Sequence, residues 1–298
     1  MHDLEGVLER LQRSAGQLEG QPVPLSGGIT NRNFRVRLGG GDYVVRLPGE
    51  RSPLLGIDRE AERIASEAAA RLGIGPPVLD GERGCLVTEF IEGGPLQGRE
   101  PAERCEELAA ALRAFHGCGV RLPVCFAVGP LLERYAATVG ARGGELPGEY
   151  DFASSVAARI TAAVGGFESR PCHDDLLAAN IIRAADGDRL MIVDWEYAGM
   201  GDPRFDLGNL AVNNAFGDSD EQRLLAAYYG GDPGARRHAQ LKLMRVLSDA
   251  REAAWGVVQG VLSELDFDFG AYAGEHFERL RAAVAGPDFE EWLDAAAG

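Results

Sequence analysis

Apolar residues recur at two different spacings, which divide the chain into a strand-rich beginning and a helical remainder. Residues 3–18 carry leucine and valine at helical intervals, and a second helical segment from about 57 to 72 ends at glycine followed by prolines. Between them, residues 24–49 read as three strands separated by glycine-containing turns. Residues 84–91 read as a buried strand, and the Gly-Gly-Pro that follows marks a boundary.

Beyond that boundary the pattern is mostly helical. It predicts the helices 100–116, 151–164, 219–229, 236–263 and 271–285, with a glycine-rich loop at 138–150. We therefore expect an α+β fold of two lobes. We expect residues 1–93 to form a small lobe of antiparallel strands with one key helix, and residues 94–298 to form a larger, mainly helical lobe.

Composition narrows the class of protein. The 298 residues are 45% apolar and 26% charged, as in an ordinary globular protein, and the formal charge is −16. This charge argues against nucleic acid or an anionic membrane as a partner and suits a cationic substrate. We expect a cytoplasmic protein, because no apolar run reaches the 18 residues of a membrane span. The five scattered cysteines predict reduced thiols.

One hairpin concentrates the candidate chemistry. His173, Asp175 and Asn180 form an H-x-D-x-x-x-x-N pattern that runs into a short apolar strand. The Gly- and Asp-containing residues 185–188 predict a turn, and the returning strand ends at Asp194. Because a hairpin brings its open ends together, Asn180 and Asp194 should be neighbours, with Asp175 on the loop before them.

These side chains suit phosphoryl transfer. The reaction needs Mg²⁺ held by hard oxygen ligands and a carboxylate that orients the attacking hydroxyl. Asn180 and Asp194 suit the metal, and Asp175 suits the hydroxyl. Each could instead cap a turn, but the set at this spacing favours catalysis.

Upstream, the strand around Arg46 resembles the kinase strand that carries a phosphate-pairing lysine. Lys242 is the only lysine and lies far beyond the hairpin, so Arg46 is the candidate for that role. Glu62 lies sixteen residues later, a separation compatible with the strand-to-helix ion pair of kinases. Glu60 is the alternative partner.

The glycine pair before the second strand has two interpretations. Gly27 and Gly28 could form a phosphate-covering loop or a plain hairpin turn. Asn31 and Asn33 could be turn residues or ligand contacts, and the sequence leaves both readings open.

Taken together, these features resemble the choline/ethanolamine kinase family, in the aminoglycoside-phosphotransferase-like branch of the protein-kinase fold. The resemblance covers most of the chain and rests on LSGGITNRNF, VVRLPG, IDREAE, HDDLLAANII, IVDWEYAGMGDPRFDLGN and AAWGVVQ followed by FDFGAYA. Arginine at the strand position is what this family tends to use. The resemblance implies a protein-kinase-like two-lobe fold, in which the N-lobe of residues 1–93 binds nucleotide and the C-lobe of residues 94–298 carries catalysis and substrate binding. It also implies ATP and Mg²⁺ as cofactors and a small-molecule amino alcohol as partner.

It also implies roles for individual residues. Asp175 is the implied catalytic residue, and Asn180 and Asp194 are the implied metal ligands. The implied nucleotide-binding set is Ser26, Gly27, Gly28, Thr30, Asn31, Arg46, Glu62, Glu89 and Ile91, in which residues 26–33 cover the phosphates and the backbone of 89–91 receives the adenine. Asp206 is expected to brace the catalytic loop.

The implied substrate pocket consists of Glu196, Tyr197, Glu252, Trp255 and Tyr272. A quaternary ammonium has no hydrogen to donate, so it needs aromatic faces and diffuse negative charge. Two further tryptophans of the animal enzymes are replaced by Asn214 and Glu252. A carboxylate at 252 suits a primary amine better than a full aromatic cage does. The alternative is that the aromatic residues only pack.

The sequence thus predicts an ATP-dependent kinase that phosphorylates the hydroxyl of choline or a related amino alcohol. An aminoglycoside or other hydroxylated-amine phosphotransferase is the closest alternative, and an inactive nucleotide-binding regulator is a further one. A protein kinase is disfavoured, because Asp194 is followed by Trp195 and Glu196 in place of Phe-Gly.

Overall fold

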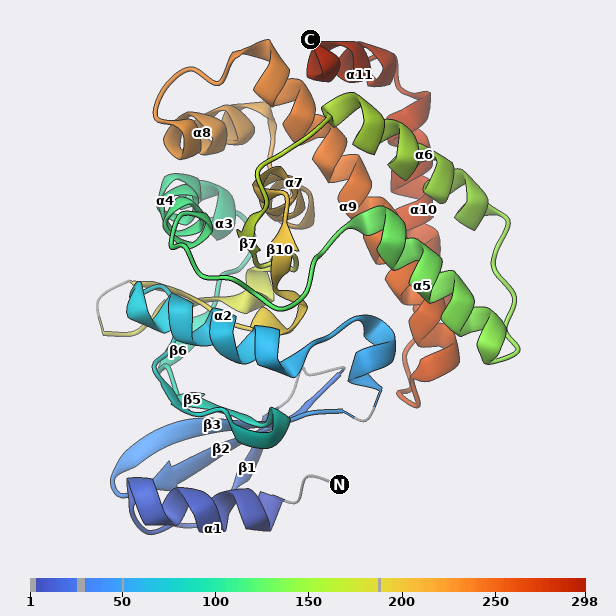
Figure 1. The fold of residues 1–298 in the computed structure, drawn as a ribbon. Coiled ribbons are helices and arrows are strands. Elements are labelled where there is room, and N and C mark those ends of the chain that lie inside the picture. Colours follow the sequence, from blue (N-terminus) through green and yellow to red (C-terminus); the bar gives the residue numbers. More distant parts are fainter. Residues whose placement is uncertain (1–3, 26–29, 50, 187–188) are drawn as a thin grey trace.

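The computed structural model describes residues 4–25, 30–49, 51–186 and 189–298. A five-stranded antiparallel sheet with α1 (Leu4–Ala15) on it lies at the bottom of Figure 1, and helices fill the upper part. The strands are β1 (Val23–Leu25), β2 (Arg32–Leu38), β3 (Gly41–Leu47), β4 (Val78–Asp80) and β5 (Leu86–Glu89), in the order β1-β2-β3-β5-β4. The three strands predicted for residues 24–49 are confirmed, as is the turn at Gly39 and Gly40 between β2 and β3, and the turn predicted at Gly27 and Gly28 lies outside the described residues.

Alternation along β2 and β3 builds the core of this sheet. Val36, Leu38, Val45 and Leu47 are buried, while the residues between them are partly or fully exposed. Their buried face meets the leucine and valine stripe of α1. The apolar face of the strands, with its period of two residues, therefore packs against the apolar face of the helix, with its period of 3.6 residues.

Helix α2 (Arg59–Arg71) connects the sheet to the catalytic hairpin. Asp58 caps it by accepting hydrogen bonds from the N–H groups of Glu60 and Ala61. Its buried face carries four alanines, Ala61 and Ala65 among them, which belong to the same apolar cluster as Trp195, and it also buries Glu62. Small side chains allow α2 to lie close to the hairpin.

The chain then passes into a second sheet. Strand β6 (Gly93–Pro95) pairs with β8 (Ile181–Ala184), which pairs with β9 (Leu190–Ile192), so the predicted pairing of two strands into a hairpin is confirmed. A separate antiparallel pair is formed by β7 (Arg170–Cys172) and β10 (Gly199–Gly201), which lie below α7 in Figure 1. We propose that the chain passes from the N-lobe to the C-lobe after residue 93.

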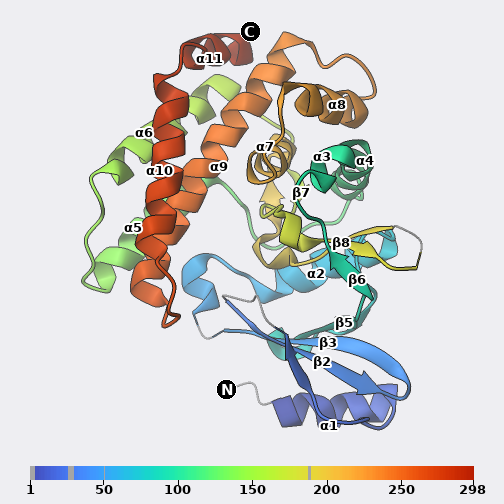
Figure 2. The same cartoon turned by 180° about the vertical axis from the view of Figure 1, so that it is seen from behind.

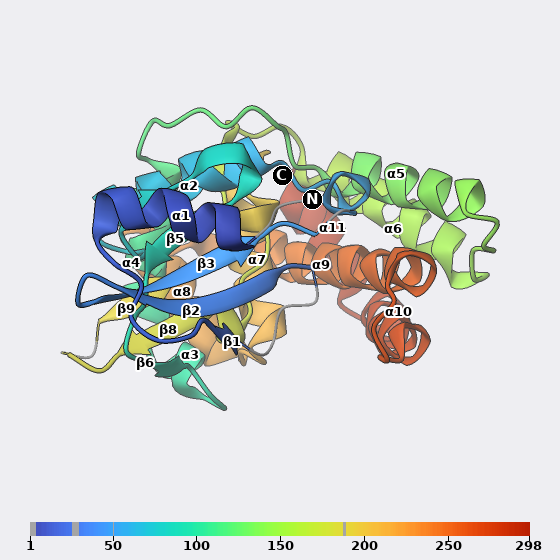
Figure 3. The ribbon, with the colours of Figure 1, turned by 90° about the horizontal axis from the view of Figure 1, so that it is seen from below.

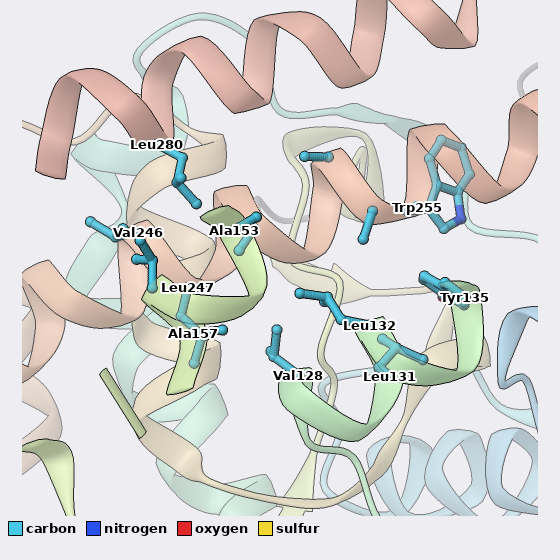
Figure 4. Packing of buried hydrophobic residues seen from close by; sticks show 14 of the residues in the cluster. Val128, Leu131, Leu132, Tyr135, Ala153, Ala157, Val246, Leu247, Trp255 and Leu280 are labelled. Carbon is cyan, nitrogen blue, oxygen red and sulfur yellow. The ribbon is translucent and has the colours of Figure 1, made fainter. Parts of the chain in front are cut away.

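The remainder is mainly helical, as predicted. The helices are α3 (Glu100–Glu103), α4 (Cys105–His116), α5 (Val128–Ala141), α6 (Glu149–Val164), α7 (Pro203–Asn213), α8 (Asp218–Tyr229), α9 (Gly234–Leu262), α10 (Phe269–Ala285) and α11 (Phe289–Ala297). Helix α9 runs through the middle, with α5, α6 and α10 around it in Figures 1 and 2. Figure 4 shows the leucine, valine and alanine packing between these helices.

Three details differ from the sequence predictions. The single helix predicted for 100–116 is broken at Arg104, whose φ of −103° and ψ of 18° are not helical. The predicted loop at 138–150 is shorter at both ends, because α5 continues to Ala141 and α6 begins at Glu149. Helices α5, α7 and α11 were not predicted.

A close helix crossing fixes the position of α7. A Cβ on Gly208 would lie 2.4 Å from the Cβ of Met244 in α9, so only glycine allows this approach. Helix α7 carries Asp206 and is thereby held behind the catalytic loop. Within the described residues, no helix combines the length and the apolar character needed to cross a bilayer.

Candidate active site

The loop between β7 and β8 carries the H-x-D motif and is braced by α7. The buried Asp206 carboxylate accepts hydrogen bonds from the N–H groups of His173 and Asp174, both at 2.8 Å, and contacts His116 Nε2 at 2.9 Å. Burial acts to raise the pKa of Asp206, but the His116 contact and the hydrogen bond from the His173 N–H hold it below its usual range. The loop backbone is therefore held by a buried carboxylate, as expected for this residue.

The two ends of the hairpin lie next to each other, as the turn pattern predicts. The Val193 N–H donates to the Asn180 carbonyl at 2.9 Å, and the Asn180 side-chain amide donates to the Asp175 carbonyl at 2.9 Å. Asp194 follows directly, with a left-handed φ of 66°, a conformation that Asp tolerates better than most residues. Oxygen-bearing side chains of Asp175, Asn180 and Asp194 thus lie around the open end of one hairpin.

Arg46 of β3 joins this end to α2. Its Nη1 donates to Glu62 at 2.7 Å and to Asp194 at 2.6 Å. The alternative partner, Glu60, instead pairs with Arg63 on the exposed face of the helix. The structure therefore selects Glu62 over Glu60, a choice that the sequence left open.

A second arginine network lies beside the first. Arg59 donates to Glu62 at 2.7 Å, to Glu196 at 3.2 Å and to the Asn31 side chain at 2.6 Å, and Asn31 donates to Glu196 at 2.7 Å. Burial, and next the charge of Asp194, raise the pKa of Glu196 to about 7. Asn31 therefore connects the first sheet to the segment that follows β9, through its hydrogen bond to Glu196, and is not only a turn residue.

The remaining nucleotide-side predictions are placed as follows. Ser26, Gly27 and Gly28 lie outside the described residues. The Thr30 carbonyl lies against Gly49, where a Cβ would approach it to 2.1 Å. Glu89 ends β5 and Ile91 follows it, so both lie where the chain leaves the first sheet.

Four of the five predicted substrate residues come together on the other side of the loop. Trp255 donates from Nε1 to the Tyr197 hydroxyl at 2.7 Å, and the Tyr272 hydroxyl donates to Glu252 at 2.9 Å. The rings of Trp255 and Tyr272 are 5.5 Å apart, in an edge-on arrangement. The fifth, Glu196, is not among them, because its carboxylate joins the Arg59 network.

Asn214 is also absent from this group. Its side-chain amide donates to the carbonyls of Leu176 and Leu210, behind the catalytic loop. It supports the loop's backbone and lines no aromatic pocket with Tyr197 and Trp255.

Sequence reasoning missed Arg59 and Arg251. Arg251 lies buried in α9, where its Nη1 donates to Glu252 at 2.5 Å and to Asp175 at 3.1 Å. One signal could have found it: an arginine followed by a glutamate within a helix otherwise rich in small and apolar residues implies a buried pair. Arg59 carries a weaker signal, since a first-turn arginine is usually solvated.

The buried charges around Asp175 change the pKa of its carboxyl. Burial raises its pKa to about 7, the Arg251 charge opposes the increase, and the Glu252 and Asp194 carboxylates add to it. Its Oδ1 accepts from Arg251, and among the described residues no donor reaches Oδ2. The free oxygen can accept a hydroxyl proton.

The donor set fits Mg²⁺. Asn180 and Asp194 offer an amide oxygen and a carboxylate, the hard ligands that this ion prefers, and the Asp194 side chain is 31% exposed. Arg46 holds Asp194 from β3, and its guanidinium is of a kind that can equally contact phosphate oxygens.

Comparisons with known proteins agree with this geometry. Residues 22–242 match the phosphotransferase enzyme family, which is well over half of the chain. The chain belongs to this family. This match confirms the predicted class of enzyme, a phosphotransferase. The resemblance to choline/ethanolamine kinases is confirmed as well, because proteins named choline kinase or ethanolamine kinase recur among the relatives of this chain.

Individual relatives are distant but extend over most of the chain. Protein LicA of Haemophilus influenzae is 27% identical over 281 residues, covering 88% of this chain and 79% of its own. A choline/ethanolamine kinase family protein of Mesorhizobium loti is 29% identical in a superposition with a TM-score of 0.81, covering 98% of each chain. The structure of aminoglycoside 2'-phosphotransferase IIIa shares the fold. It is 14% identical with a TM-score of 0.65, and the superposition covers 94% of this chain and 99% of that chain. The protein-kinase-like α+β fold is confirmed.

Proposed function

We propose that the protein transfers the γ-phosphoryl group of ATP, with Mg²⁺, to the hydroxyl of a small amino alcohol such as choline or ethanolamine. The observation that carries the proposal is the convergence of Asp175, Asn180 and Asp194 at one hairpin end, with Arg46 bound to Asp194. Phosphoryl transfer asks for little else, since positioning and charge neutralisation supply most of the rate enhancement.

On the nucleotide side, Arg46 neutralises phosphate charge and Glu62 keeps its guanidinium in position. The backbone of residues 89–91 receives the adenine, and residues 30–33, the described part of the predicted phosphate-covering segment, contact the phosphates. Asn180 and Asp194 hold Mg²⁺, which when bound neutralises charge on the transferring group.

On the acceptor side, Asp175 orients the attacking hydroxyl. Oδ2 accepts the hydroxyl hydrogen while Arg251 holds Oδ1, so the carboxylate keeps one orientation. Burial of this carboxyl places its pKa close to neutral, which suits a group that takes up a proton during transfer and releases it afterwards.

The amine of the acceptor would lie near Glu252, Trp255 and Tyr272. The curated relatives named choline kinase or ethanolamine kinase support this acceptor class. An aminoglycoside is less favoured, because the aromatic side chains at this site lie close together while a large polyol needs an open, acidic surface.

The test is Mg²⁺-dependent release of ADP from ATP, measured with choline, ethanolamine, other amino alcohols and an aminoglycoside panel. We expect release that depends on an amino alcohol. Tight ATP binding without turnover of any acceptor would favour the regulator, and turnover of aminoglycosides alone would overturn the acceptor class.

A further inference from the structure

The predicted ammonium pocket already contains a cation, the guanidinium of Arg251. Its Cζ lies 4.4 Å from the centre of the Tyr197 ring, above the ring face. Its Nη1 donates to Glu252 at 2.5 Å and to Asp175 at 3.1 Å. The same aromatic face and the same two carboxylates are what an incoming quaternary ammonium needs.

This cation is permanent. Burial acts to lower the pKa of Arg251, but Glu252, Asp175 and Tyr197 keep it well above its ordinary value. The Nε and Nη2 atoms are buried without a hydrogen-bond partner among the described residues, which fits a guanidinium plane stacked on a ring. Removing it would leave the buried Glu252 and Asp175 charges uncompensated.

Glu252 nevertheless retains capacity for a further donor. One oxygen accepts from Arg251 and the other from the Tyr272 hydroxyl, whereas a carboxylate has about four acceptor sites. An amine with N–H groups can use the remaining lone pairs. A quaternary ammonium cannot, because it has no hydrogen to donate. Every protonated amine meets Arg251 as a like charge, but only one with N–H groups offsets that repulsion by donating to Glu252.

We propose that Arg251 is a built-in cation that selects against quaternary ammonium acceptors, so the acceptor carries an amine with at least one N–H donor. This inference rests on the proposed function and narrows its substrate class from amino alcohols in general to primary, secondary or tertiary ones. Arg251 acts as a specificity residue through the space and charge that it occupies.

The first test varies only the number of N-methyl groups on one alcohol, using the wild-type protein. Ethanolamine, its monomethyl and dimethyl derivatives and choline are compared by kcat/KM. We expect the largest single drop, about tenfold or more, between dimethylethanolamine and choline, where the last N–H is lost. A kcat/KM for choline equal to or above that for ethanolamine overturns the inference.

The second test needs no turnover. Binding of tetramethylammonium is followed by saturation transfer to its methyl protons, with wild type, Arg251→Met and the matched control Arg245→Met, which removes a carboxylate-paired arginine from the same helix away from this pocket. We expect a signal with Arg251→Met only. A wild-type signal that is lost in Tyr197→Leu, or no signal with a folded Arg251→Met, overturns the inference.

The two tests separate the two claims. Absence of turnover with every acceptor, together with the expected tetramethylammonium pattern, removes the proposed function and leaves the role of Arg251 intact. If Arg251→Met does not fold, the wild-type arms still decide: tetramethylammonium binding at Tyr197 overturns the inference, and its absence supports it.

Discussion

Two arginines in this protein make the same kind of contact and have different surroundings. Arg46 bridges Glu62 and Asp194, and Arg251 bridges Glu252 and Asp175. Arg46 joins β3, α2 and the hairpin end, which are far apart in sequence. It lies on β3 and Arg251 lies on α9, and Figure 3 shows these two elements in separate regions of the molecule. Arg251 joins adjacent residues of α9 to the catalytic loop.

Exposure separates the two. The Arg46 side chain is 13% exposed and the Arg251 side chain 2%. Each has one deeply buried partner, Glu62 at 2% and Glu252 at 4%, and one more open partner, Asp194 at 31% and Asp175 at 14%. A partly open pair can exchange a partner for a ligand, but a sealed pair cannot without losing buried charge compensation. We infer that the Arg46 pair receives the nucleotide and metal, and that the Arg251 pair shapes the acceptor pocket.

The largest expected effect comes from removing the carboxylate that lies between the two arginine regions. Asp175→Ala should lower kcat by a factor of about 10²–10⁴, because the hydroxyl loses its proton acceptor. ATP affinity should stay within about twofold, since Asp175 faces the acceptor side. Turnover numbers and ATP binding by calorimetry check this, and unchanged turnover would remove Asp175 from the mechanism.

The next effect tests the open pair. Arg46→Met should lower kcat/KM for ATP about a hundredfold, because phosphate charge and Asp194 both lose their cationic partner. Arg46→Lys should recover part of the loss, since it restores the charge without the planar fork. Steady-state kinetics with each substrate varied separately measures the effect, and an equal loss in a matched Arg63→Met variant would argue against a specific role.

A smaller effect tests the aromatic wall beside the sealed pair. Trp255→Ala should raise KM about tenfold for whichever amino alcohol the enzyme uses best, with much less change in KM for ATP. Trp292→Ala, on α11, is the control for loss of a tryptophan that only packs against the core. Equal changes in both KM values for Trp255→Ala would indicate mere packing.

The smallest effect concerns stability. Both carboxylate oxygens of Asp174 are buried without a partner among the described residues, and burial, then the Asp206 charge, raise its pKa well above its ordinary value. Asp174→Asn removes this charge and keeps a residue that tolerates the left-handed φ of 67°. We expect stabilisation of about 1–3 kcal/mol at pH 8.

The pH dependence of that stabilisation has a definite sign. An acid whose folded pKa is raised destabilises the fold once the unfolded chain ionises, so its penalty is absent below about pH 4 and grows as the pH rises toward the folded pKa. Denaturant unfolding at pH 4 and pH 8 checks this. A gain of the same size at both values would assign the effect to packing instead of charge.

Part of the fold followed from local pattern, and part did not. The hairpin around Asn180 and Asp194 was predictable because turn residues separate two apolar runs. Helix α5 was missed because Gly129 and Pro130 look like a turn, whereas proline is tolerated in a first helical turn. What makes this segment helical is the burial of Leu132 and Tyr135 against the α9 region, a contact that no local window contains.

By itself, the sequence determined the order and spacing of the reactive side chains, because a loop, a turn and a returning strand are local features. Only the tertiary structure decided the partners of the charges: Arg46 meets Asp194 across 148 positions, and Arg251 meets Asp175 across 76. Electrostatic pairing depends on distance in space and on burial, and neither is written in the neighbouring residues. The fold therefore decided which cation contacts Asp194 and which one lies on the face of the Tyr197 ring.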